Sequence, residues 1–181
     1  FTIQDLIYPY FKKNIFYNNS NINEIKNGEY VERYFDGTTK IIGYYNNNLM
    51  EGIWTYYYVN GNIKAKGSFS KGDGTNICTL TDVPLSGRNG DWFFNFDNGQ
   101  LMFSGKYKNG IKEDGEWIKY FKNGNISEIG NFINDQKDGI HLLYFEDSKI
   151  FFEDYYDNGE FIKRIWYDKD GKISDKNPLY K

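Results

Sequence analysis

The feature that most constrains the fold is a pattern of aromatic residues and glycines that recurs along most of the chain. The stretch "GEWIKYFKNGNISEIGNF" (residues 115–132) closely matches "GIWTYYYVNGNIKAKGSF" (residues 52–69). Units of this kind begin at Gly28, Gly52, Gly90, Gly115, Gly139 and, more weakly, Ile162. They are separated by 24, 38, 25, 24 and 23 residues, so one unit carries about 14 extra residues, within 71–89. A period near 24 residues indicates a repeat architecture in which neighbouring units bury each other.

Turn signals separate short aromatic and β-branched runs inside each unit. Twelve of the 19 glycines follow Asn or Asp, as seven Asn-Gly pairs and five Asp-Gly pairs. Such pairs favour tight hairpin turns, because the backbone of these turns adopts positive φ. Asn60-Gly61 and Asn123-Gly124 lie in the middle of their units. Each unit is therefore predicted to form a strand, a tight turn and a second strand.

The aromatic residues and glycines also predict how the two strands of a hairpin pair. Side chains alternate between the two faces of a strand. With a two-residue loop, Trp54 pairs with Gly67, and Gly52 pairs with Phe69. The same rule pairs Trp92 with Gly105 and Trp117 with Gly130. A ring laid over a cross-strand glycine fills the space that the missing side chain leaves. We therefore expect each glycine to make room for the ring opposite it.

These patterns predict an all-β fold, an extended antiparallel meander of tandem β-hairpin repeats of about 24 residues in a single sheet. The repeat array is expected over residues 28–171, with an inserted loop near 71–89. Residues 1–27 are expected to be an N-terminal cap or a degenerate repeat, and residues 172–181 a C-terminal tail. The exposed strand at either end of such a sheet can pair with a second copy, which makes a homodimer an open alternative.

Composition and charge exclude several classes of function. The formal net charge is −3 and the pI is about 5.3, which argues against a nucleic-acid partner. No apolar run is long enough for a transmembrane segment. The chain opens on Phe1, so we expect that a signal peptide or another upstream segment has been removed. The bacterial cytoplasm and an exported, surface-associated location both stay open.

The sequence offers few residues for catalysis or metal binding. His141 is the single histidine, and it occupies the position that tryptophan holds in three other units, so we expect it to fill a ring position. Cys78 is the single cysteine, and we expect a loop or packing role because no histidine is near it in sequence. The segment "DKDG" (residues 168–171) lies at the standard turn position and lacks the later acidic ligand of a calcium loop. We predict that the protein is not an enzyme, with no catalytic, metal-binding or cofactor-binding residues.

Three features are candidates for binding a partner. The first is an acidic stretch that could steer a basic partner or form solvated turns, with Glu146, Asp147, Glu153 and Asp157 as candidates. The second is a row of tyrosines on the face opposite the tryptophans, namely Tyr57, Tyr120, Tyr144 and Tyr167. This row is either a recognition strip or a second, minor packed layer. The third is the insertion, with Arg88 as its candidate, which is either a loop that carries specificity or a harmless excursion.

The repeats resemble the MORN-repeat variant family, which is widespread in bacteria. The matching stretches are "GIWTYYYVNGNIKAKGSFSKG", "GDWFFNFDNGQLMFSGKYKNG", "GEWIKYFKNGNISEIGNFIND" and "GIHLLYFEDSKIFFEDYYDNG", which keep a G-x-W-x-x-Y-x-x-N-G spacing or its close variants. Choline- and glucan-binding cell-wall repeats also mix Gly, Trp and Tyr, but their tighter period fits less well. The resemblance implies a hairpin array that is not itself catalytic and serves protein–protein contact.

Two functions follow from the resemblance and stay open at this point. One is a protein-binding module of the antitoxin or immunity type, with a toxin as its protein partner. The alternative is an exported bacterial surface protein that binds host protein, glycan or membrane through an aromatic face.

Overall fold

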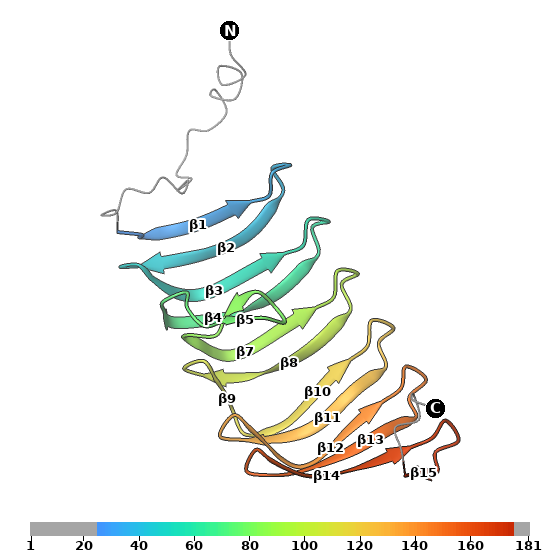
Figure 1. Cartoon of the computed structure of the whole chain (residues 1–181). Coiled ribbons are helices and arrows are strands. Elements are labelled where there is room, and N and C mark those ends of the chain that lie inside the picture. Colours follow the sequence, from blue (N-terminus) through green and yellow to red (C-terminus); the bar gives the residue numbers. More distant parts are fainter. Residues whose placement is uncertain (1–24, 176–181) are drawn as a thin grey trace.

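The structure is a computed structural model that describes residues 25–175, and these residues contain strands and turns with no helix (Figure 1). The strands are β1 (Gly28–Arg33), β2 (Thr39–Asn46), β3 (Leu49–Tyr57), β4 (Ile63–Gly72), β5 (Ile77–Cys78), β6 (Val83–Pro84), β7 (Arg88–Asn95), β8 (Leu101–Lys108), β9 (Ile111–Lys112), β10 (Gly115–Tyr120), β11 (Ile126–Ile133), β12 (Gln136–Tyr144), β13 (Ile150–Asp157), β14 (Glu160–Tyr167) and β15 (Ile173–Ser174). Nearly all of the predicted cap lies outside the described residues.

Twelve of these strands follow one another across a single sheet in the order in which they occur in the chain, skipping β5, β6 and β9. Strand β9 pairs with β8, while β5 and β6 form a separate two-stranded sheet. All of the pairings are antiparallel, and the sheet forms a long curved meander that does not close (Figure 1). The prediction of an all-β hairpin array is confirmed. Strand β15 pairs with β14 inside the segment that we had assigned to the tail.

The hairpin turns reach the predicted register by a different route from the one assumed. Trp54 does pair with Gly67, as predicted. However, the loop has three residues rather than two: Tyr58 N–H donates to Asn62 O at 2.8 Å, and Gly61 N–H donates to Tyr58 O at 2.9 Å. Gly61 has φ +86°, and the strand register shifts by one residue beside the turn. A three-residue loop followed by a one-residue bulge leaves the strands in the register that a two-residue loop would give.

Each ring lies over a glycine, but over a different glycine from the one predicted. A Cβ added at Gly67 would overlap the indole ring of Trp92, which belongs to the next unit, rather than that of its own partner Trp54. The same relation joins Gly43 to Trp54, Gly105 to Trp117 and Gly130 to His141. The glycines therefore hold neighbouring hairpins together, which a pairing rule within one hairpin could not predict.

The core consists of rings on one face of the sheet, which we call the inner face and define by Trp54, Trp92, Trp117 and His141. Second-strand rings alternate with these residues, as in Phe69 against Trp92, with ring centroids 4.9 Å apart. Most of the contacts between them are edge-to-face, an arrangement that contributes about 0.5–1.5 kcal/mol per pair beyond burial. Because each ring covers its neighbours, Trp54 and Trp92 are buried although the sheet is a single layer.

The insertion folds back over the inner face instead of projecting from the array. Val83 of β6 is fully buried within the aromatic core, and Leu85 packs against that core. Asp82 forms an ion pair with Lys64 of β4 at 3.0 Å. The insertion thus supplies a partial second layer over the middle of the array.

Candidate functional site

The predicted tyrosine row lies on the face of the sheet that points away from the core, which we call the outer face. Tyr57, Tyr120, Tyr144 and Tyr167 follow an inner-face residue by one or three positions in their strands, and all four are half-buried. At the end of the row, Glu153 accepts hydrogen bonds from Tyr167 at 2.9 Å and from Tyr155 at 2.8 Å. The structure therefore brings together two predicted candidates, Tyr167 and Glu153.

The acidic stretch is not a single patch. Glu146 and Asp147 lie in the turn between β12 and β13, where the carbonyl of Glu146 accepts a hydrogen bond from Asn125 at 2.7 Å. Asp157 is the last residue of β13 and lies at the other end of that strand, about 25 Å from this turn for a strand of this length. The stretch is contiguous only in sequence, and the structure does not bring these acidic candidates together.

Arg88, which we predicted as a partner contact, is fully buried, with no exposed side-chain surface. Its Nε donates to Pro84 O at 2.7 Å and its Nη2 donates to Val83 O at 2.9 Å. The guanidinium also lies 4.9 Å from the Trp92 ring centroid and 5.0 Å from that of Tyr107. Arg88 therefore fastens the insertion to the inner face, and it is not available to a partner.

A periodic signal in the sequence could have revealed the place of Arg88. It lies two residues before the first glycine of its unit, a position that Lys26 and Lys137 hold in two other units. All three cations lie over the second-strand ring of their own unit, at 5.0 to 5.1 Å from the centroids of Tyr45, Tyr107 and Tyr156. Of these three cations, only Arg88, which the insertion covers, is completely buried.

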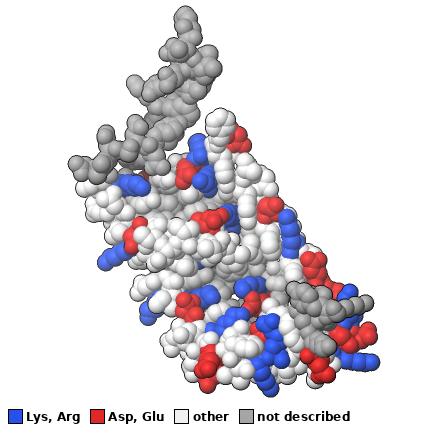
Figure 2. Space-filling model, viewed as in Figure 1, with Lys and Arg blue, Asp and Glu red and all other residues white. Residues whose placement is uncertain are grey.

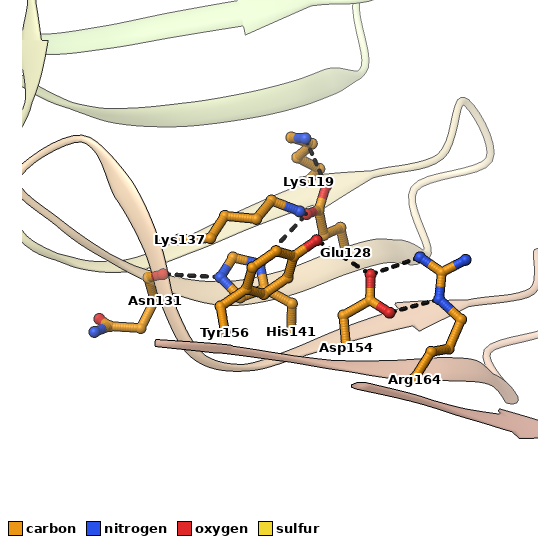
Figure 3. Close-up of polar contacts among 8 residues, drawn as sticks. All are labelled: Lys119, Glu128, Asn131, Lys137, His141, Asp154, Tyr156 and Arg164. Atoms are coloured by element: carbon orange, nitrogen blue, oxygen red, sulfur yellow. Dashed lines mark hydrogen bonds and ion pairs between the residues drawn. The ribbon is translucent and has the colours of Figure 1, made fainter. Parts of the chain in front are cut away.

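Charged residues missed by sequence reasoning replace rings on the inner face of the later units (Figure 3). The Glu128 carboxylate accepts hydrogen bonds from Lys119 at 2.5 Å and from Lys137 at 2.9 Å. His141 faces the same carboxylate at 3.5 Å through Nδ1, while its Nε2 lies 2.8 Å from the carbonyl of Asn131. A carbonyl can only accept, so Nε2 carries a proton.

His141 does fill a ring position, as predicted. It has no exposed surface, and it packs edge-to-face between Phe132 and Tyr156. Its contact with the Asn131 carbonyl reproduces that of Trp92, whose Nε1 donates to Ser68 O at 3.0 Å. Both carbonyls belong to the residue that follows the glycine beneath the ring. Such a buried imidazole is poorly placed for general acid–base catalysis.

In the next unit, other residues replace both the glycine and the ring that lies over it. Asp154 stands where the four earlier units have glycine, and Arg164 stands where three of the earlier units have tryptophan. The two side chains form a bidentate ion pair, with Arg164 Nε and Nη2 donating to the Asp154 carboxylate at 2.5 and 2.7 Å (Figure 3). Tyr156 also approaches Asp154 at 3.3 Å. The Asp154–Arg164 ion pair thus joins neighbouring strands where the other units use a ring packed on a glycine.

Acid is expected to weaken the fold through Glu128. Burial alone would raise the pKa of Glu128, but hydrogen bonds from His141, Lys119 and Lys137 outweigh it and hold that pKa well below its ordinary 4.5. Because the folded state favours the carboxylate, its contribution is complete above pH 4.5 and is lost progressively as the pH falls toward the folded pKa.

Glu128→Gln should reduce the free energy of unfolding at neutral pH by about 1–2 kcal/mol, since the lysine partners are partly exposed. It should also flatten the acid dependence. Urea unfolding at neutral and acidic pH measures both effects. Glu116→Gln, at an exposed position of the same hairpin, should leave both quantities unchanged. If the free energy of unfolding of the Glu128 variant fell with acid as steeply as that of the wild type, Glu128 would not be the source of the acid dependence.

The outer face carries exposed apolar side chains, and residues 25–175 place no second layer over them. Ile42, Tyr44, Ile53, Phe93 and Ile140 are between 42% and 64% exposed. Charges of both signs are interspersed on the surface that Figure 2 shows, with uncharged regions between them. On the side of the molecule that Figure 2 shows, lysine and arginine side chains do not gather into one basic area.

Comparison with known families gives one result, and it concerns three of the hairpins. Residues 50–71, 88–109 and 113–134 match the MORN repeat variant. These MORN-variant segments cover β3–β4, β7–β8 and β10–β11, so the matched stretches coincide with structural hairpins. No curated protein matches the chain.

The resemblance to the MORN-repeat variant is therefore confirmed for three of the four quoted stretches, and the match fits a binding module. Residues 25–175 contain no helix long and apolar enough to cross a membrane. The same residues contain no group of three His, Cys, Asp or Glu side chains placed to hold a metal ion.

Proposed function

We propose that the protein is a non-enzymatic binding module that contacts a protein partner through the outer face of its sheet. The observation that carries this proposal is the set of exposed apolar side chains on that face, which includes Ile53 and Phe93. The inner face is closed by its own rings and by the insertion, so it offers less surface to a large partner. Half-buried tyrosines on the same face add rings and hydroxyls that suit protein recognition.

The absence of catalysis is part of the same proposal. The single histidine is enclosed by rings and serves as a packing residue. Its neighbour Glu128 is engaged by two lysines. A binding role needs neither residue to exchange protons, which is consistent with their contacts.

Site-specific photocrosslinking in the native cell tests the outer face. A photoreactive amino acid at position 53 or 93 should give a discrete crosslinked protein, whereas the same probe at Phe35 should not. Phe35 is fully exposed at a turn, so it controls for exposure alone. Identical products from all three positions, or none from the outer face, would refute the proposed surface.

Charge substitutions give a second measurement on the same surface. Ile53→Lys with Phe93→Lys should change the free energy of unfolding by no more than about 0.5 kcal/mol, because both side chains are exposed. Binding of the crosslinked partner should weaken at least tenfold. Retained affinity in the folded variant would show that another face binds.

The identity of the partner separates the two roles that fit the fold. In the antitoxin or immunity role, the protein co-purifies with a toxin encoded beside it and protects cells in which both are expressed. Failure to protect would count against this role. In the surface role, the precursor carries an export signal, and a precursor without one would count against export.

A further inference from the structure

The third and fourth units share fewer paired residues than any other two neighbouring units, and the sequence explains why. The interval from Gly90 to Gly115 is 25 residues, one longer than the intervals that start at Gly28 and Gly115. The added length lets β9 pair with β8, and β8 meets β10 at one residue pair, Phe103 with Lys119. Other neighbouring units pair at four or more positions. This seam separates strands that elsewhere lie side by side.

A cavity of about 240 Å³ lies at the seam, on the inner face. One wall comes from the insertion, through Cys78, Leu80 and Leu85. The opposite wall consists of rings from the third and fourth units, including Phe103, Trp117 and Phe132. Two distant parts of the chain therefore enclose an apolar space that neither part forms alone.

Charged groups at this cavity favour an anion. Lys112 and Lys119 line it, against one acidic residue, Asp135. Lys119 is held by Glu128 at 2.5 Å, whereas Lys112 is 4.0 Å from Asp135, at the limit of an ion pair. The Lys112 ammonium lies over the rings of Phe132 and Trp117, at 3.8 and 5.3 Å from their centroids. Burial lowers the pKa of Lys112, as expected for a cation that lacks a close counter-charge.

We propose that the seam cavity binds a small carboxylate with an apolar body, whose charge is met by Lys112. A cavity of 150 Å³ accommodates benzene, so 240 Å³ suits a ligand of about ten non-hydrogen atoms. A straight-chain carboxylate of eight carbons has this size and chemistry. The apolar body contacts the rings and the two leucines, and the carboxylate lies at the Lys112 end. This site is separate from the outer face and its partner.

Octanoate is the probe for a direct test by isothermal titration calorimetry on the full chain. It should bind saturably with one site per chain. Octanol, which keeps the chain and lacks the charge, should bind at least tenfold more weakly, and octylammonium more weakly still. Absence of saturable octanoate binding, or equal binding of all three compounds, would overturn the proposal.

Variants at the cavity test whether octanoate binding depends on the Lys112 charge or only on the size of the cavity. Lys112→Met removes the charge and keeps an unbranched side chain one atom shorter, so it should weaken octanoate about tenfold and leave octanol unchanged. Asp135→Asn removes the competing carboxylate at a positive-φ position that Asn tolerates, so it should tighten octanoate severalfold. Lys108→Met, at an exposed position of β8, should change neither compound. An unchanged octanoate affinity in the folded Lys112 variant would contradict the role of that lysine.

Cys78 provides a readout that needs no substitution. It is the single cysteine of the chain, and it lines the cavity. Burial alone would raise the pKa of its thiol, but hydrogen bonds from Thr81 and backbone groups, with the charge of Arg88, lower it and favour reaction. Saturating octanoate should slow labelling of Cys78 by a thiol reagent at least threefold, while octylammonium should not. An unaffected labelling rate would place octanoate outside the cavity.

Discussion

Gly67→Ala is expected to destabilise the protein by about 3 kcal/mol, although the change adds one methyl group. The added Cβ would overlap the Trp92 ring, which cannot move aside because it is fully buried between Phe69 and Phe94. The Trp92 indole is also anchored by its hydrogen bond to Ser68 O. For a chain of this size, the melting temperature should fall by about 6–12 °C. Thermal and urea unfolding measure the effect.

Two controls identify the ring as the cause. Gly61→Ala lies in a hairpin turn with open space around the new Cβ, so it should cost only the backbone strain at φ +86°, about 1 kcal/mol. In a Trp92→Ala background, Gly67→Ala should lose most of its cost, because the overlap is gone. Additive effects of the two substitutions would contradict the proposed contact between neighbouring units.

Arg88→Lys should also cost about 3 kcal/mol, despite keeping the charge. Lysine cannot reproduce the hydrogen bonds of Nε to Pro84 O and of Nη2 to Val83 O, and both carbonyls would lose a buried donor. The ammonium would also be desolvated among rings with fewer partners. Loss of these bonds should release the insertion, so cleavage within residues 73–87 should be faster than in the wild type.

Urea unfolding and limited proteolysis test this prediction together. Arg33→Lys is the matched control, because Arg33 is exposed and hydrogen-bonds to the turn at Gly37 and Thr39. It should change the free energy of unfolding by no more than about 0.5 kcal/mol. If Arg88→Lys matched this control in both measurements, Arg88 would not be the residue that fastens the insertion.

The strand order and the hairpin register could be predicted because both depend on local signals. Asn-Gly and Asp-Gly pairs mark most of the turns, and apart from the insertion each connection is too short to reach a distant strand. The register of Trp54 with Gly67 was correct although the assumed loop was one residue too short, since the bulge restored the alignment. The residues of one hairpin were therefore enough to predict the strand register within that hairpin.

Contacts between hairpins were harder to predict. The stagger of one unit against the next decides which glycine lies beneath Trp92, and no turn sequence encodes that stagger. Arg88 was predicted as a partner contact because it belongs to the insertion, and an inserted loop often carries specificity. Its burial depends on rings of two strands and on carbonyls of the insertion, which only the folded chain brings together. The acidic stretch was treated as one patch because its residues are close in sequence. An extended strand runs between them and holds its two ends far apart.

The placement of each tryptophan over the glycine of the preceding unit gives the array a direction. In the first four hairpins, the glycine of the second strand lies beneath the ring of the next unit, so all of these overlaps run in the same direction along the chain. Excising residues 115–138 would bring His141 over Gly105 and preserve the overlap, whereas a deletion that is not a whole period would leave a ring without a glycine beneath it. Gene rearrangements that lengthen or shorten such a chain should therefore have breakpoints one whole period apart.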